Sequence, residues 1–177
     1  MTLLLVLLSP QFFLFIMKYE NKTKKLINIL LKKNVKICAA ESITGGRFAF
    51  EIIRNANASK IFDYGLVTYS NDSKSIILGL KDKINKTNVV SEEMSKYMAK
   101  EVTKFSNHKT VLAVSCTGQA GPTILNTNFP IGTVFIGISY RERIFSFKKC
   151  FNQKDRTLII NSTVKEMINS CLDIIEA

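Results

Sequence analysis

The strongest constraint on the fold is the alternation of short apolar runs with segments of helical spacing. Helical spacing means apolar residues that recur every three or four positions, so that one face of a helix is buried. Three of the apolar runs are typical of buried strands, and two more flank a short polar turn and predict a hairpin. The alternation predicts an α/β protein, a three-layer α/β/α fold whose mixed, mostly parallel sheet has helices on both faces. The strand-like runs are "VKICAA", "FDYGLVTY", "TVLAVSC", "IGTVFIGISY" and "RIFSFKKCF".

The helical segments come between and after these runs. At the third of them, Ser70 or Asn71 can cap the helix start, and Ser91 can cap the fourth. A chain of 177 residues is long enough for one domain with a proper core. The expected helices cover residues 24–33, 45–56, 70–80 and 91–105, and a last one runs from Asp155.

The N-terminal stretch "MTLLLVLLSPQFFLFIM" is apolar but shorter than the ~20 residues that a membrane helix needs. Pro10 interrupts it, and it has neither the positive start nor the cleavage site of a signal peptide. We interpret residues 1–16 as an apolar leader from an incorrectly extended start, with a natural start at Met17 and a single domain over 17–177. A membrane anchor and an uncleaved signal are the alternatives; without a real leader we expect no membrane contact.

Composition narrows the possible chemistry. The formal charge of +11 is compatible with nucleic-acid binding, but the lysines are scattered and form no basic stripe. We therefore attribute the charge to compositional bias and expect no nucleic-acid partner, DNA association being the alternative. His108 is the only histidine, which argues against a histidine triad or a multi-histidine metal site. The four cysteines lie far apart, without a C-x-x-C pair, and are interpreted as buried free thiols in a reducing cytoplasm.

Polar clusters follow three of the strand-like runs: "ESITGG", "TYSNDSK" and "CTGQAGP". In open α/β sheets, ligands bind at the carboxyl ends of the strands. The three clusters together predict a site at that edge.

Ser42 lies in the first cluster, at or just before a helix start, where free N–H groups favour negative charge. Thr44, Gly45 and Gly46 are small enough to let a substrate approach the backbone. Three interpretations of Ser42 are open: a helix cap, a phosphate ligand and a nucleophile. Glu41 beside it is expected to hold the loop through backbone hydrogen bonds.

A nucleophilic serine needs a base, and with histidine excluded the usual substitute is a lysine with a lowered pKa. Lys74 would lie in the first turn of the helix that follows the second cluster, where the dipole and burial both disfavour its charge. Tyr69, at the strand end, could relay a proton or orient Lys74. The alternative is an ordinary solvated lysine.

The third cluster holds Thr117, Gly118, Gly121 and Pro122 and is typical of a backbone cradle for a polar or anionic ligand. An ordinary turn between a strand and a loop is the alternative.

At these residues the chain resembles a known family. The segments "AAESITGG", "GLVTYSNDSK", "VVSEEM", "AVSCTGQAGP" and "PIGTVFIGI" have the order and spacing of the CinA C-terminal domain family, from Lys24 to the C-terminus. The resemblance implies an α/β/α fold and, in active members, nicotinamide mononucleotide deamidase activity without metal or cofactor. It also implies a cytoplasmic enzyme of pyridine nucleotide salvage that takes a small nucleotide and can self-associate.

The resemblance assigns roles by motif. Ser42 resembles the nucleophile and Lys74 the base, with Tyr69 nearby. Thr117, Gly118 and Gly121 resemble part of the nucleotide pocket. Arg156 resembles an arginine before the last helix, which can bind a phosphate in a bidentate way.

Three departures from the family pattern stand out. Ile43 replaces a cysteine, "TILNTNF" replaces a glycine-rich loop, and Ile160 replaces a second basic residue. The last two motivate an alternative function, a catalytically silent nucleotide-binding or partner-binding module of the same fold.

Overall fold

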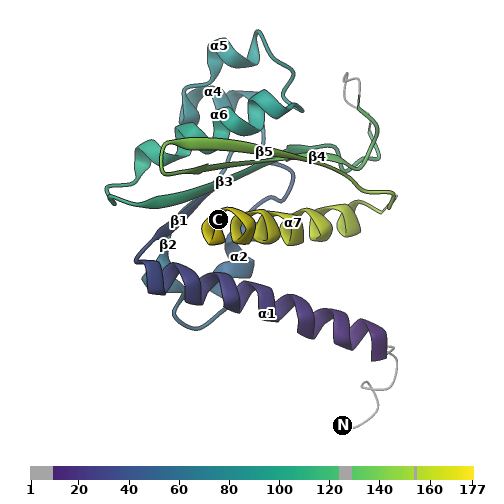
Figure 1. Cartoon of the computed structure of the whole chain (residues 1–177). Helices are drawn as coiled ribbons and strands as arrows, with labels where there is room; N and C mark the ends of the chain where they lie inside the picture. The colour runs from purple at the N-terminus through teal and green to yellow at the C-terminus, as the bar shows by residue number, and fades with distance from the viewer. Residues whose placement is uncertain (1–9, 124–128, 154) are drawn as a thin grey trace.

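A five-stranded sheet forms the centre of the molecule (Figure 1). The computed structural model describes residues 10–123, 129–153 and 155–177, with side chains described from residue 22 onward. Its strands follow the order β2-β1-β3-β4-β5. They are β1 (Lys36–Glu41), β2 (Phe62–Val67), β3 (Val111–Gly118), β4 (Thr133–Tyr140) and β5 (Arg143–Cys150).

The sheet is mixed, as predicted. β1 pairs in parallel with β2 and with β3, whereas β4 pairs antiparallel with β3 and with β5. β4 and β5 form the expected hairpin. Because β1, β2 and β3 are parallel, their carboxyl ends meet at one edge, where Glu41 lies beside Val67 and Cys116.

Helices cover both faces of the sheet, which confirms the three-layer α/β/α fold (Figure 1). One face carries α1 (Pro10–Lys33), α2 (Arg47–Ile53), α3 (Ala58–Ile61) and α7 (Arg156–Glu176). The other carries α4 (Asn71–Leu78), α5 (Lys81–Ile84), α6 (Glu92–Val102) and the 3-10 turn η1 (Thr103–Phe105).

The middle of β1, residues 37–40, is apolar, and the two helical layers bury both faces of the strand there. Ile37 and Ala39 join the core under α1, α2 and α7, whereas Cys38 and Ala40 join the core under α6. A strand buried on both faces has a continuous apolar run instead of an alternating one. This is the pattern that the sequence shows.

Helix α6 approaches the sheet closely at Gly137 of β4. A Cβ atom there would lie 2.1 Å from the backbone oxygen of Ser95, which also accepts a 2.6 Å hydrogen bond from the Ser115 hydroxyl. Only glycine permits this contact between helix and strand. It holds α6, and with it the segment that leads into α6, against β3 and β4.

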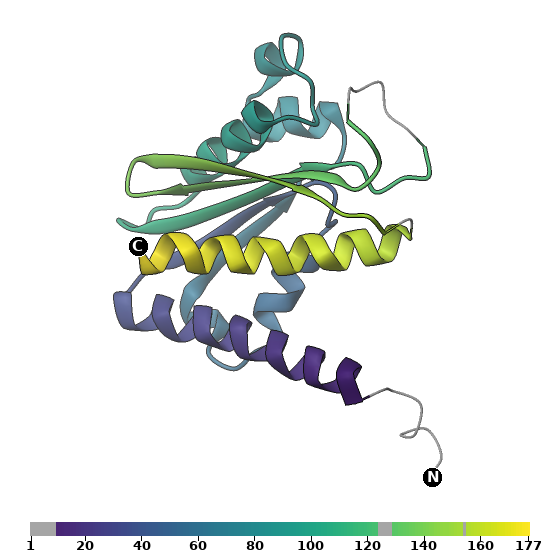
Figure 2. The same ribbon diagram turned by 45° about the vertical axis from the view of Figure 1, so that its right-hand side comes forward.

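Three details differ from the sequence-based expectations. The helix expected over 24–33 begins at Pro10, whose missing N–H costs nothing in a first turn, and its N-terminal part extends beyond the rest of the domain (Figure 2). The short helices α3 and α5 were not predicted, because four residues carry no readable period. All four cysteines are free, but Cys150 is exposed, which corrects the prediction that all are buried.

Residues 1–9 of the apolar leader lie outside the described residues, as do residues 124–128 of the altered loop "TILNTNF". Within the described ranges, no helix has both the length and the apolar run needed to cross a bilayer.

Candidate active site

The loop between β1 and α2 carries Ser42 and turns sharply through two glycines. β1 ends at Glu41, and α2 begins only at Arg47. Gly45 and Gly46 have φ angles of 57° and 95°, in the left-handed region that side-chain-bearing residues rarely adopt. Ser42 therefore lies before the turn, at the end of β1, and not at the helix start that the sequence suggested.

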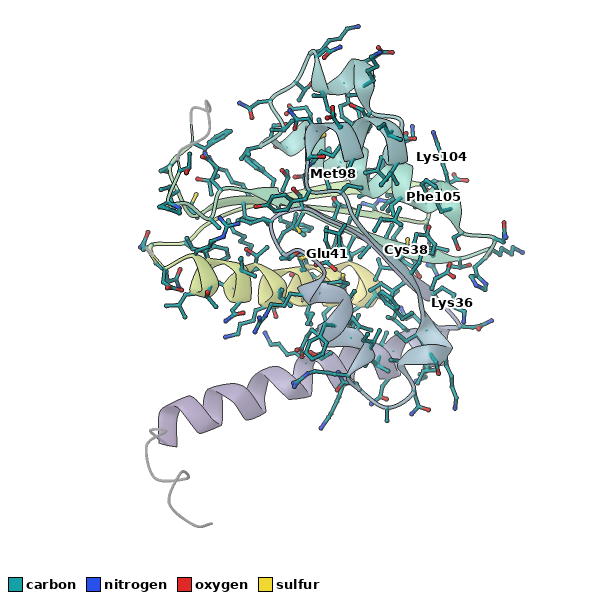
Figure 3. All side chains as sticks on the ribbon, turned by 180° about the vertical axis from the view of Figure 1, so that it is seen from behind. Lys36, Cys38, Glu41, Met98, Lys104 and Phe105 are labelled. Carbon is teal, nitrogen blue, oxygen red and sulfur yellow. The ribbon has the colours of Figure 1, made fainter. Side chains whose placement is uncertain are left out.

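Glu41 holds this loop from inside the protein. Its carboxylate accepts hydrogen bonds from the Thr44 hydroxyl at 2.6 Å and from the backbone N–H groups of Gly46, Phe48 and Ala49 at 3.0, 3.0 and 2.9 Å. The side chain is fully buried. Figure 3 shows Glu41 deep in the molecule beside α2, with Lys36 at the far end of the same strand. The predicted holding role of Glu41 agrees with these contacts.

These hydrogen bonds narrow the interpretation of Ser42. The first N–H groups of α2, which would bind a phosphate or an oxyanion, donate to Glu41 instead. The N-cap position is Gly46, with no side-chain cap, so Ser42 is not a helix cap. The helix-terminus argument for a phosphate ligand is lost as well, and the nucleophile interpretation stays open.

Lys74 lies directly beside Ser42. Its Nζ is 3.1 Å from the Ser42 Oγ and donates hydrogen bonds to the backbone oxygens of Thr68 at 2.8 Å and Tyr69 at 3.1 Å. A neutral amine has two hydrogens and one lone pair. With both hydrogens on the carbonyls, the lone pair of Lys74 points to the Ser42 hydroxyl.

The environment of Lys74 makes that neutral amine easier to form than it is in a solvated lysine. Only 2% of the residue is exposed. Burial lowers the pKa of Lys74 from its ordinary value of 10.5 to about 8, because an ammonium loses its hydration there. Ser70, and not Asn71, caps α4 by accepting a hydrogen bond from the Ser73 N–H, which makes Lys74 the fourth residue of the helix.

Cys116 packs beneath the Ser42 loop without joining the candidate chemistry. Its Sγ lies 3.0 Å from the Thr44 hydroxyl. Burial and the nearby Glu41 carboxylate raise the pKa of the Cys116 thiol to about 11, so the sulfur stays uncharged near neutral pH. A thiolate would attract the Lys74 ammonium and raise the pKa of the amine. An uncharged thiol has no such effect.

Arg156 bridges two sides of the site. Its Nη1 donates to the Gly121 carbonyl at 2.6 Å, and its Nη2 donates to the Tyr69 hydroxyl at 2.8 Å. Of the two predicted roles of Tyr69, orientation of Lys74 fits its backbone carbonyl contact, whereas its hydroxyl faces Arg156. A guanidinium has five N–H donors, so Arg156 retains donors for a ligand.

Thr117 holds the opposite wall of the site. Its hydroxyl donates to the backbone oxygen of Val89 at 2.5 Å and so ties β3 to the segment before α6. The side chain is almost fully buried. Thr117 therefore contributes to the pocket by fixing this segment. The position of Thr117 at a strand end did not indicate this contact.

These residues surround one cavity of about 730 Å³, large enough for a nucleotide. Among the predicted site residues, those that line it are Ser42, Tyr69, Lys74, Thr117, Gly118, Gly121 and Arg156. Thr44, Gly45 and Gly46 do not line it; Thr44 and Gly46 donate hydrogen bonds to Glu41 instead. Asn71 and Gln119, which belong to the predicted polar clusters but had no assigned role, also line it, and so do Ile84, Thr87 and Asn88, which lie outside those clusters.

Two further expectations concern residues around the cavity. Ile160 packs against the core and is absent from the cavity lining, so its side chain has no contact with the site. In the described part of the chain, no three histidine, cysteine, aspartate or glutamate side chains gather as a metal site.

Comparisons with known proteins match this fold and this sequence. The family model of the CinA C-terminal domain matches residues 19–175. A putative competence-damage inducible protein of Thermoanaerobacter pseudethanolicus is 36% identical over 146 residues, 82% of this chain and 35% of that protein. A CinA-like protein of Flavobacterium psychrophilum is 36% identical over 143 residues, 79% of this chain and 34% of that protein. The chain thus spans about a third of the length of these relatives.

Solved structures agree. The competence/damage inducible protein CihA of Agrobacterium tumefaciens superposes with a TM-score of 0.82 at 27% identity, covering 90% of this chain and 96% of that one. A CinA superfamily protein of Klebsiella pneumoniae has a TM-score of 0.83 at 22% identity, covering 89% of this chain and 98% of that one. The second likeness, at this identity, shows the fold alone.

The contacts of Glu41 generate a prediction about stability. Both carboxylate oxygens of Glu41 accept hydrogen bonds. In Glu41→Gln, the NH2 group therefore faces an N–H or O–H donor in either orientation of the amide, and that hydrogen bond is lost. We expect a loss of about 2 kcal/mol or more in the free energy of unfolding, measured by urea denaturation. Glu93→Gln, on the exposed first turn of α6, is the control and should change stability by less than about 0.5 kcal/mol. Equal stability of Glu41→Gln and the parent would contradict the holding role.

Proposed function

The chain belongs to the CinA C-terminal domain family, and on that premise we propose that it hydrolyses nicotinamide mononucleotide to nicotinate mononucleotide and ammonia. The choice of substrate rests on the resemblance of its motifs to those of active family members. The observation that carries the reaction type is the contact between Ser42 and the buried Lys74. A hydroxyl beside an amine of lowered pKa is the arrangement of a serine nucleophile with a lysine base.

The acylation step begins with the neutral Lys74 amine. It removes the proton of the Ser42 hydroxyl as the oxygen attacks the carboxamide carbon of the substrate. The tetrahedral intermediate then collapses, and the C–N bond breaks. The ammonium of Lys74 returns the proton to the leaving nitrogen, which departs as ammonia. An ester between Ser42 and the nicotinoyl group remains.

Deacylation repeats these steps with water. Lys74, neutral again, takes a proton from a water molecule that attacks the ester carbonyl. The C–O bond to Ser42 breaks, and the serine recovers its proton from Lys74. The product is the carboxylic acid of the nucleotide, which ionises at neutral pH. The Thr68 and Tyr69 carbonyls keep the lysine in place through both steps.

The phosphate of the substrate would lie toward Arg156. A mononucleotide differs from its riboside only in that dianion, and Arg156 carries a fixed positive charge at the rim of the cavity. Its two hydrogen bonds to Gly121 and Tyr69 orient the guanidinium before any ligand arrives. We further propose that the reaction serves pyridine nucleotide salvage in the cytoplasm, where free thiols such as these persist.

The first test removes each member of the catalytic pair. Ser42→Ala and Lys74→Met, which keeps the volume of the buried chain, should each lower kcat at least roughly 100-fold, because each removes nucleophilic or proton-transfer chemistry. Ammonia release from nicotinamide mononucleotide by the purified protein is the measurement. Lys81→Ala, an exposed lysine of the neighbouring helix α5, is the control and should keep the parent rate.

Two results would contradict this account. A parent protein that releases no ammonia lacks the proposed activity, and calorimetric binding of the nucleotide without turnover would favour the silent module. A Ser42→Ala variant with the parent rate would exclude the serine mechanism.

A second test concerns the phosphate. Arg156→Ala should lower kcat/KM for the mononucleotide roughly 30-fold or more, mainly through KM, since the phosphate is remote from the amide. The riboside, which lacks the phosphate, should be hydrolysed slowly and at the same rate by both proteins. Tyr69→Phe is the matched control, because it removes one partner of Arg156 but keeps the charge. Equal losses on both substrates would mean that Arg156 only tethers the rim of the cavity.

A further inference from the structure

A second cavity, of about 760 Å³, lies at the opposite end of the sheet from the candidate active site. The end of α6, the start of β3 and the turn between β4 and β5 surround it. β3 begins at Val111 in this cavity and ends at Gly118 in the active-site cavity. At about 3.3 Å per residue, a strand of 8 residues holds these ends roughly 23 Å apart, so the two cavities are separate. Figure 1 shows the turn between β4 and β5 at the opposite end of the sheet from the start of α7.

Cations dominate the charge of this second cavity. Its walls include Lys100, Lys109 and Arg141, and Glu142 is the only carboxylate among the lining residues. All four residues are exposed, so water reaches their charged groups. His108 also lines the cavity and can add a further positive charge when it is protonated.

The three fixed cations are not neutralised by partners of their own. Lys96, one turn before Lys100 on the same face of α6, pairs with Glu92 at 2.6 Å. Among the described residues, Lys100, Lys109 and Arg141 form no ion pair with a carboxylate. Their charges therefore remain available to a ligand in the cavity.

The turn that carries Arg141 has an unusual sequence for its backbone. Arg141 and Glu142 connect β4 to β5 with φ angles of 48° and 65°. Two-residue turns of this kind usually contain asparagine and glycine, because other residues rarely adopt a positive φ. The Arg141 guanidinium also lies 5.1 Å from the centroid of the Tyr140 ring, a contact that restricts its orientation. Strained residues of this kind are common at ligand sites.

The size and lining of the cavity indicate the class of ligand. Pockets for small organic molecules have volumes of roughly 300 to 1,000 Å³, and this cavity lies within that range. Val111 and Ile144 provide apolar contacts for an organic group, and the cations suit phosphate oxygens. Because the cations surround a hollow and do not follow a line across the surface, they fit a compact ligand better than a nucleic-acid backbone.

We propose that this cavity is a second binding site, for a small organic molecule with two or more phosphate groups, such as a nucleoside triphosphate. Lys100, Lys109 and Arg141 bind the phosphates, and Val111 and Ile144 contact the organic part. The three cations exceed the single lining carboxylate by two charges, so the site prefers a ligand with several negative charges to one without phosphate.

The test is calorimetric titration of the full chain with metal-free ATP at about 0.15 M salt. We expect saturable binding to one site per chain, with a Kd of about 1 mM or below. Arg141→Asn removes the charge but suits a positive φ, so it should weaken binding roughly fivefold or more without lowering the melting temperature. Glu142→Gln removes the repelling carboxylate and should strengthen binding roughly twofold or more.

Lys96→Ala, which removes the same charge from α6 outside the cavity, is the control and should bind ATP as the parent does. Arg156→Ala should also bind like the parent, because Arg156 lines the other cavity. Adenosine, which has no phosphate, should bind at least roughly tenfold more weakly than ATP.

Four results would overturn the proposal. The first is a parent chain that shows no saturable binding of ATP up to about 5 mM. The second is an equal affinity of the parent, Arg141→Asn and Glu142→Gln. The third is a loss of ATP binding in Arg156→Ala, which would place the ligand in the active-site cavity. The fourth is a DNA duplex that binds more tightly than ATP and is weakened by Arg141→Asn, since the ligand would then be a nucleic acid.

Discussion

The buried carboxylate of Glu41 is the interaction on which the candidate site depends. It ends β1 and at the same time binds the first N–H groups of α2, so one side chain fixes both ends of the intervening loop. A carboxylate without hydrogen-bond donors would be costly in this position, and the loop and α2 together supply four donors. The result is a tight turn through Gly45 and Gly46 that leaves Ser42 facing the cavity.

Lys74 makes the second half of this arrangement. Its helix begins at Asn71 behind the Ser70 cap, shortly after the end of β2, so the amine reaches back to the strand ends and to Ser42. In the proposed mechanism, burial and two backbone carbonyls take the part that a histidine and an aspartate have in a triad, because burial lowers the pKa of the amine and the carbonyls orient it. The arrangement suits a chain with a single histidine outside the site.

Sequence patterns predicted the parts of this protein that depend on local periodicity. The strands, helices α4, α6 and α7 and the three polar clusters are where the sequence placed them, whereas α1 begins earlier than expected, and two of those clusters bring Ser42 and Lys74 together. The patterns did not reveal that Glu41 occupies the N–H groups of α2, because that depends on the path of the turn. Nor did they reveal the wall near Val89, which Thr117 holds across 28 residues of chain. Both are tertiary contacts with no periodic signal.

The pH dependence of kcat/KM for nicotinamide mononucleotide tests the central claim, that a neutral Lys74 activates Ser42, most directly. Between pH 7 and 10 the substrate phosphate, with a second pKa of about 6, is already doubly ionised, so the enzyme's own group dominates. The neutral fraction of Lys74 rises with pH, so kcat/KM should rise up to about pH 8, the lowered pKa of the amine, and then level off. A profile that is flat from pH 7 upward, or one that keeps rising toward the ordinary lysine pKa of 10.5, would contradict the claim.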